Sequence, residues 1–226
     1  MARSREDFVA AGVALVEEQG FDHLTSRNLG EAMGIHSTAV YRHFPQWDQL
    51  VAAVTDALLG KVVEMHRAEL ETTADPRQRI LGAIALVRQE AFRNPELMGN
   101  LLQIAAAPPS LATPHIDMLV RVVTESLQQM GLRGRNLAVG WQALESFTLG
   151  FLAQEFVGHP HHLDNRLGRR RMVGVPDFTA NAQTTDDIAA INEAAFWLSA
   201  HAILDACAAL SDTPVGRRFD PAPGHS

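Results

Sequence analysis

The stretch MGIHSTAVYRHFP, residues 33–45, decides how the N-terminal part of this 226-residue chain folds. Gly34 is typical of the residue that ends one helix, and Pro45 stops the next one, because proline cannot continue the helical hydrogen-bond ladder. Between them the sequence predicts a short helix that begins at His36 or Ser37. A helix so short must be explained by what its two sides carry.

One side of this short helix is apolar, and the other side carries hydrogen-bond donors. At about 3.6 residues per turn, Val40 and Phe44 fall together, and Ile35 can join them from the turn. The opposite side carries Thr38, Ala39, Arg42 and His43. Tyr41 lies at the border, where its ring can pack while its hydroxyl points outward. The apolar side anchors the helix to a small core, so the donor-rich side is predicted to face outward.

Helical periodicity recurs along the rest of the chain, and alternating β-branched runs are nearly absent, so an all-α fold is predicted. The predicted helices cover about 4–19, 25–33, 36–44, 46–71, 76–93, a short segment after 95, 114–130, 135–157 and 184–210. Thr25 is the expected N-cap of the second helix, and Asn28 is its expected capping-box partner. Residues 158–183 are predicted to form a long loop and residues 211–226 a disordered tail.

The overall composition excludes several classes of protein. The formal net charge is −7 at pH 7, so the whole chain is not a basic coat for nucleic acid. The one cysteine, Cys207, excludes an internal disulfide and fits a reducing compartment. Glu6 and Asp7 stand where a signal peptide needs apolar residues, and no apolar run is expected to span a bilayer. We therefore expect a cytoplasmic protein that does not contact a membrane.

A helix pair joined by a glycine turn, with donors on its second helix, has the design that places the second helix in the DNA major groove. Arg42 suits a guanine or a phosphate, and Thr38 suits a base methyl group or a phosphate. Gly30 fits this interpretation because the second helix must approach the first closely. The alternative is a plain helical hairpin whose polar side is only solvated. Residues 1–50 are not basic overall, and this weakens the electrostatic argument for DNA binding.

Residues 17–51, EEQGFDHLTSRNLGEAMGIHSTAVYRHFPQWDQLV, resemble the N-terminal signature of the TetR family of transcriptional regulators. The matching features are Gly20-Phe21, Thr25, Arg27, Glu31-Ala32, Gly34-Ile35, Tyr41, His43-Phe44 and Leu50. The later helices resemble that family only in number and length. The resemblance implies a helix-turn-helix DNA-binding domain over residues 1–46 and a ligand-binding and dimerisation domain over residues 47–210.

The resemblance further implies a homodimer in which each subunit inserts its third helix into half of a palindromic double-stranded DNA operator. The DNA-binding residues that it implies by position are Thr25, Arg27, Ser37, Thr38, Tyr41, Arg42 and His43. Two positions depart from the family pattern: Trp47 replaces a usual lysine that grips phosphate, and Ala39 replaces a frequent threonine. Because the first departure removes a charge, DNA affinity is expected to depend on Arg3 and Arg5 instead.

Two long helices in the C-terminal part are apolar on more than one side, so each needs two neighbours. A four-helix bundle across a two-fold axis satisfies this need, whereas the core of a monomer is the alternative. The predicted dimer interface consists of Phe151, Glu155, Ile191, Ala195, Leu198 and Ala202.

The family uses the same part of the chain to hold a small-molecule effector. Aromatic and methionine side chains on the middle helices suit an adaptable and mostly apolar cavity, although such residues also fill ordinary cores. The candidate pocket residues are Met65, His66, Phe92, Met98, Leu102, Gln103, Met118, Trp141, Glu145 and Phe147. The sequence does not specify which effector they would bind.

No metal site and no cofactor are predicted. His159, His161 and His162 have loose spacing, and no cysteine or second cluster completes a set of four ligands. A competing hypothesis is a helical enzyme or small-molecule carrier with a degenerate helix pair. No Ser-His-Asp set or phosphate-binding loop supports catalysis. The favoured prediction is a ligand-responsive transcriptional repressor that is not an enzyme.

Overall fold

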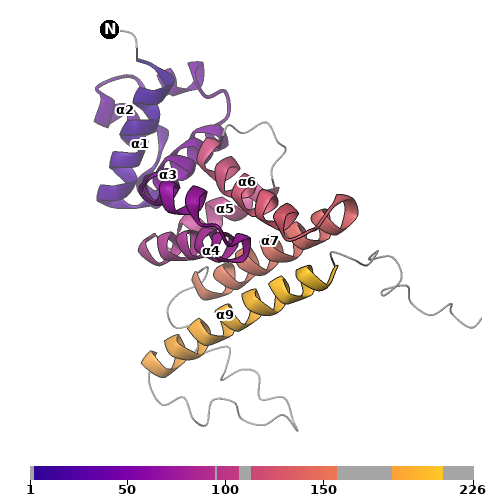
Figure 1. Cartoon of the computed structure of the whole chain (residues 1–226). Coiled ribbons are helices and arrows are strands. Elements are labelled where there is room, and N and C mark those ends of the chain that lie inside the picture. The colour runs from indigo at the N-terminus through magenta and orange to yellow at the C-terminus, as the bar shows by residue number, and fades with distance from the viewer. Residues whose placement is uncertain (1–2, 95, 107–112, 157–184, 211–226) are drawn as a thin grey trace, which may run out of the picture. The chain divides into compact units, whose positions relative to one another are not determined.

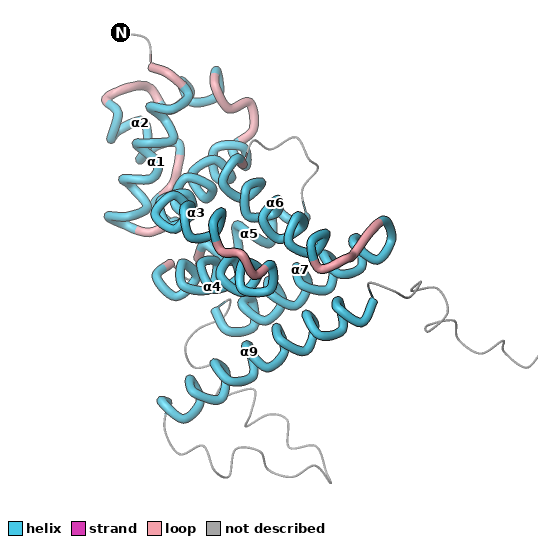
Figure 2. Tube along the Cα trace, in the orientation of Figure 1, coloured by secondary structure: helices cyan, strands magenta, loops and turns pink. Residues whose placement is uncertain are grey.

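The computed structural model describes residues 3–94, 96–106, 113–156 and 185–210. Every regular element in these residues is helical, and Figure 2 shows no strand among them, so the predicted all-α class is confirmed. The predicted loop at 158–183 and the predicted tail at 211–226 lie outside the described residues. So do two clusters within that loop, the histidines His159, His161 and His162 and the arginines Arg169, Arg170 and Arg171.

Short helices make up the N-terminal part of the chain. They are α1 (Arg5–Gln19), the 3₁₀ helix η1 (Phe21–His23), α2 (Ser26–Met33) and the 3₁₀ helix η2 (Ser37–Arg42). Ser4 caps α1, because its hydroxyl accepts a hydrogen bond from the Asp7 amide while the Asp7 carboxylate accepts one from the Ser4 amide. Gly20 ends α1 with a φ of 87°, a value that favours glycine.

Thr25 caps α2 as predicted, because its hydroxyl accepts a hydrogen bond from the Asn28 amide at 3.2 Å. The Asn28 side chain does not complete a capping box. It donates instead to the carbonyl oxygen of His23 at 2.9 Å, which fastens α2 to the end of η1. The capping-box prediction for Asn28 is therefore wrong, although the side chain does reach back past the cap.

Further helices follow, with bounds close to the predicted ones (Figure 1). They are α3 (Trp47–Thr72), α4 (Pro76–Arg93), α5 (Leu97–Ala106), α6 (Pro114–Gln129), α7 (Gly134–Phe156) and α9 (Thr185–Leu210). By their contacts the residues form two compact units: Met1–Thr72 with Gly82–Val122, and Thr73–Leu81 with Val123–Ser226. The predicted functional boundary at residue 46 coincides with neither edge, and it stays a prediction.

In the first unit, α1 packs closely on α3. A Cβ atom at position 12 would lie 2.6 Å from the Cγ2 atom of Val54, so glycine at this position lets the two helices approach. Lys61 on α3 adds an ion pair to Glu17 on α1, with a 2.5 Å distance from Nζ to Oε1. The N-terminal helices therefore share their core with α3.

Asp56, only 3% exposed, joins α3 to the start of α6 within the same unit. Its Oδ1 atom accepts hydrogen bonds from the amides of His115 and Ile116 at 3.0 and 2.9 Å, and its Oδ2 atom lies 2.7 Å from His115 Nδ1. Gly60 leaves room for the imidazole, since a Cβ atom there would lie 2.6 Å from the ring. The carboxylate thus satisfies two amides that α6 cannot satisfy itself.

In the second unit, α7 and α9 lie side by side (Figure 1). The rings of Phe147, Phe151 and Trp197 all lie 5.1 to 5.3 Å from the buried ring of Phe196. Arg77, in the first turn of α4, donates to the Asp205 carboxylate and to the His201 carbonyl oxygen on α9. An aromatic cluster and an arginine thus fix α9 within this unit.

One expectation from the sequence needs correction. Residues Ala189–Leu210 of α9 have a mean hydropathy of 1.2 over 22 residues, and by length and composition alone this helix could cross a membrane. The expectation that no run is long enough is therefore wrong by this measure. The cause is a high content of alanine and leucine, interrupted within the segment by Glu193 and Asp205.

Candidate nucleic-acid interface

The helix pair formed by α2 and η2 is joined by a tight turn. Gly34 ends α2 in the left-handed conformation, with a φ of 65°, as predicted. The next amide, that of Ile35, donates to the carbonyl oxygen of Gly30 at 2.9 Å. The chain therefore folds straight back over the helix that it has just left.

Gly30 is required by this approach. A Cβ atom at position 30 would lie 3.0 Å from the carbonyl oxygen of Ile35 and 3.0 Å from the Cα atom of Ser37, both of them backbone atoms. Backbone atoms cannot swing away as a flexible side chain can, so only glycine fits without a shift of the turn. The expectation that Gly30 permits a close approach of the second helix is confirmed.

The second helix of the pair starts where predicted, at Ser37, but it ends at Arg42 instead of Phe44, and its geometry is not the predicted one. It is a 3₁₀ helix, with a hydrogen bond from the Ala39 amide to the His36 carbonyl at 2.9 Å and one from His43 to Val40 at 3.0 Å. A segment of this length often winds as 3₁₀. Pro45 also biases the residue before it away from the α conformation, so the helix cannot lengthen into a regular one.

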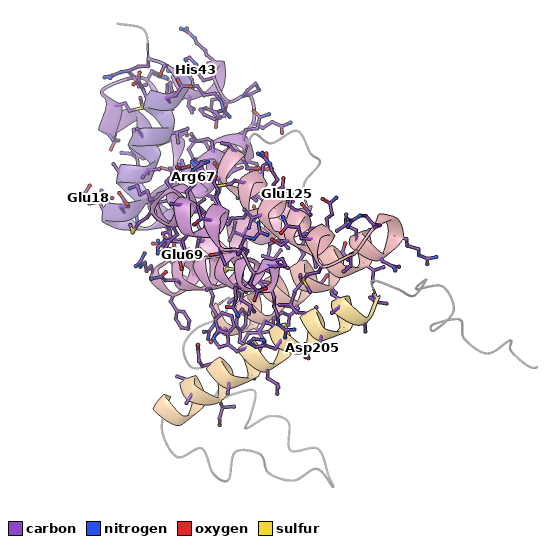
Figure 3. The ribbon with its side chains drawn as sticks, viewed as in Figure 1. Glu18, His43, Arg67, Glu69, Glu125 and Asp205 are labelled. Carbon is purple, nitrogen blue, oxygen red and sulfur yellow. The ribbon has the colours of Figure 1, made fainter. Side chains whose placement is uncertain are left out.

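The predicted division of this helix into two sides holds despite the different winding. Val40 and Phe44 are 2% and 1% exposed, whereas Tyr41 is 45% exposed. Thr38 and Arg42 are exposed as well. Figure 3 labels His43, also exposed, at the opposite end of the N-terminal helices from Glu18. The donor-rich side of η2 therefore faces outward.

The other predicted DNA-binding residues differ in their exposure and in the contacts that their side chains make within the protein. Thr25 is exposed at the start of α2, and Ser37 is half-buried at the start of η2. Arg27 is highly exposed, but its Nε atom donates to Glu31 Oε1 at 3.0 Å on the same helix. The Thr38 hydroxyl lies 2.9 Å from His36 Nδ1, so His36 orients it.

Sequence reasoning missed one contact that joins the segment just before the helix pair to the rest of the first unit. The Oε2 atom of Glu96, just before α5, accepts a hydrogen bond from the Phe21 amide at 2.7 Å. The two residues are 75 positions apart, and no local pattern links them. The start of α5 is thereby tied to the turn that leads into the helix pair.

The candidate pocket residues are spread over both units. Met98 and Met118 are buried, Leu102 is half-buried and Gln103 is exposed in the first unit. His66, half-buried, keeps its Nδ1 atom 3.0 Å from the Val62 carbonyl oxygen of its own helix. Trp141, Glu145 and Phe147 are half-buried in the second unit.

Two pocket candidates do not fit an enclosed cavity. Met65 is 74% exposed and Phe92 is 54% exposed. The ring of Phe92 lies under the guanidinium group of Arg88, 4.8 Å from its Cζ atom. These two residues were selected for their apolar character, but each lies on an outer side of its helix.

The predicted interface residues on α9 leave apolar surface uncovered. Leu198 is 73% exposed and Ile191 is 52% exposed, and Ala202 is exposed beside them. Phe151 and Glu155 on α7 are half-buried, and so is Ala195. Among the described residues, no group of three or more His, Cys, Asp and Glu side chains could hold a metal ion.

Comparison with known proteins points to one family. Residues 8–54 match the model described as bacterial regulatory proteins, tetR family. An HTH-type transcriptional regulator from Saccharopolyspora erythraea is 23% identical over 154 residues, which are 68% of this chain and 61% of that protein. The chain spans less than two thirds of the length of the first curated relatives that it matches.

Solved structures share the fold over nearly the whole chain. The structure of BioQ with its double-stranded DNA operator has a TM-score of 0.60 at 18% identity, covering 92% of this chain and 99% of BioQ. Streptomyces coelicolor ActR in complex with (S)-DNPA has a TM-score of 0.68 at 16% identity, covering 93% of this chain and 100% of ActR. At these identities the likeness shows a common fold.

Replacing Gly30 by alanine should lower the free energy of unfolding by about 1–3 kcal/mol, because the new methyl group meets backbone atoms that cannot move aside. Urea unfolding followed by circular dichroism measures this change. The matched control is Gly99→Ala on α5, where a Cβ atom would meet nothing within 4 Å. The control should be stabilised by roughly 0.4–1 kcal/mol. Equal effects of the two substitutions would show that the approach at Gly30 is not tight.

Proposed function

We propose that this chain, which belongs to the TetR family of bacterial regulatory proteins, is a repressor that binds a palindromic operator as a homodimer. It is a transcriptional regulator built on a helix-turn-helix. The observation that carries the proposal is the outward-facing, donor-rich side of η2, which the turn at Gly30 and Gly34 holds in place. The operator-bound structure of BioQ, a protein of the same fold, supports double-stranded DNA as the partner.

The residues on that side divide into two roles. Arg42 and Thr38 would read base edges in the major groove, and Ser37 would lie at or near them. Tyr41, His43 and Thr25 would hold phosphates and so set the register of the helix on the duplex. Thr25 also opens α2, and the amides at a helix N-terminus favour an anion. A protein that acts on the chromosome in this way works in the cytoplasm.

A fluorescence anisotropy titration with a labelled duplex from the promoter region of the chain's own gene tests DNA binding. Arg42→Ala should weaken specific binding by about 1–3 kcal/mol, the usual worth of a bidentate base contact. The control is Arg67→Ala on α3, about 30 Å along that helix from its start. It should bind like the wild type.

Equal affinity and equal sequence preference of the Arg42 variant and the wild type would remove Arg42 from the reading role. The competing hypothesis, a helical enzyme or small-molecule carrier with a degenerate helix pair, predicts no specific DNA binding by the wild type either.

The homodimer is proposed from the uncovered side of α9. Leu198 and Ile191 expose large apolar surfaces in a single chain, and a second copy across a two-fold axis would cover them. The aromatic cluster around Phe196 would brace α9 from behind. Phe151, Glu155, Ala195 and Ala202 would complete the interface.

Light scattering on the purified protein at micromolar concentration should give about twice the mass of one chain. Leu198→Glu should dissociate it, because a glutamate there would be buried in the interface without a partner. Met65→Glu is the matched control, since Met65 is 74% exposed and Leu198 73% exposed in one chain. A monomeric wild type, or equal dissociation by both variants, would contradict this interface.

The proposed effector is a mostly apolar small molecule. Within the first unit, Met98, Leu102 and Met118 are the proposed apolar contacts. Trp141 and Phe147, in the second unit, stay predictions from the sequence. ActR, which shares the fold, has been solved with a small molecule bound. In the first unit α3 runs as one helix from Trp47, just after η2, to Thr72, so it can carry a displacement to the helix pair. A hundredfold preference of the effector for the released form corresponds to about 2.7 kcal/mol of coupling.

A thermal-shift screen of apolar and amphipathic metabolites, followed by a DNA-release assay, tests the effector. Apolar compounds should raise the melting temperature and lower DNA affinity. Stabilisation only by highly charged compounds would contradict the apolar pocket. Stabilisation without any change in DNA affinity would contradict the coupling through α3.

A further inference from the structure

Two arginines at the N-terminus contact the helix pair, one at the end of α2 and the other just after η2. The Arg3 Nη2 atom donates to the carbonyl oxygen of Met33 at 3.1 Å. The Arg5 Cζ atom lies 4.5 Å from the centroid of the Phe44 ring. Met33 is the last residue of α2, and Phe44 lies just after η2.

The contact of Arg3 completes the end of α2. The last carbonyl groups of a helix have no partner within the helix, and that of Met33 is one of them. A guanidinium group both donates to such a carbonyl and places positive charge at the negative end of the helix dipole. Arg3 therefore stabilises α2 at the residue where the turn begins.

The contact of Arg5 acts at the far end of η2. Phe44 is 1% exposed, so its ring is fixed in the core below η2, and the guanidinium group of half-buried Arg5 lies over that ring. Close by, the ring of Phe8 lies 5.2 Å from the ring of His43. The first two turns of α1 thus hold the C-terminal end of η2 through a cation–π contact and a ring contact.

These contacts bear on how the missing phosphate-gripping lysine at Trp47 is compensated. From charge alone, Arg3 and Arg5 were expected to bind DNA in its place. In the folded chain, however, each guanidinium group already contacts the protein: Arg3 holds the end of α2, and Arg5 holds the C-terminal end of η2.

We propose that Arg5 is a positioning residue for DNA reading: it fixes the orientation of η2 through the Phe44 ring and does not itself bind a phosphate. Arg3 assists by holding the end of α2. The inference rests on the proposed reading of DNA by η2. Arg5 would then affect DNA affinity indirectly, by orienting η2. An indirect effect of this kind depends on salt differently from a direct contact with a phosphate.

The dependence on salt separates the two roles because each phosphate contact releases counterions. Losing one contact makes the slope of log K against log salt shallower by about 0.9. Losing a positioning contact lowers the affinity of the folded protein at every salt concentration and leaves the slope unchanged. A contact that serves stability alone lowers the melting temperature and leaves the affinity of the folded protein unchanged.

The test uses the full-length chain and the duplex with the highest affinity in the anisotropy titration, at about 50 to 200 mM salt. Arg5→Ala should weaken binding about two- to fivefold, as the loss of one cation–π contact implies, with an unchanged slope. Phe44→Leu, which removes the ring but keeps the charge of Arg5, should weaken binding without changing the slope. The variant that carries both substitutions should bind DNA as weakly as the weaker-binding single variant, and no more weakly. The reason is that both substitutions remove the same contact between Arg5 and Phe44.

A slope that becomes shallower by about 0.9 per subunit in Arg5→Ala would overturn the proposal and make Arg5 a phosphate ligand. Unchanged affinity, or additive losses in the double variant, would overturn it as well. If Phe44→Leu does not fold, the DNA affinity and the salt slope of Arg5→Ala are sufficient to distinguish a positioning residue from a phosphate ligand. Failure of the wild type to bind any duplex would defeat the proposed function together with this inference, whereas the other outcomes concern Arg5 alone.

Discussion

The backbone approach at Gly30 is the constraint on which the N-terminal part of this chain depends. The chain returns so closely over α2 that a Cβ atom at position 30 would meet the backbone at Ile35 and Ser37. This approach lets Val40 and Phe44 reach the core. Because one side of η2 is buried there, its other side must face outward. The orientation of the donors on η2 thus follows from the absence of one side chain.

Several polar contacts join the N-terminal helices to the rest of the first unit. Lys61 pairs with Glu17, and Glu96 accepts a hydrogen bond from the Phe21 amide. Asp56 holds the start of α6 on α3, the helix that follows η2 directly. Removing this buried carboxylate would leave both backbone amides without a hydrogen-bond partner, at a cost of about 1–3 kcal/mol each. The N-terminal helices are therefore not a free-standing module, and a displacement of α3, α5 or α6 has a physical route to them.

Local signals in the sequence predicted the elements well, whereas contacts between distant residues could not be predicted. Caps and breakers such as Thr25 and Gly34 act within a few residues, so they can be read directly. The winding of η2 depends on its short length and on Pro45, and the helical wheel assumed a regular α-helix. Selecting Met65 by residue type ignored which side of α3 it occupies. The pairing of Glu96 with Phe21 depends on the folded arrangement, and one sequence carries no signal for it.

Selection of bound duplexes from a randomised DNA pool, carried out in parallel with the wild type and with Arg42→Ala, tests the central claim most directly. The claim is that the outward side of η2 reads DNA sequence as part of a symmetric assembly. The account predicts that the wild type enriches an inverted repeat, and that the variant enriches the same repeat with a relaxed preference at one position of each half. No enriched sequence, or an identical motif from both proteins, would contradict it.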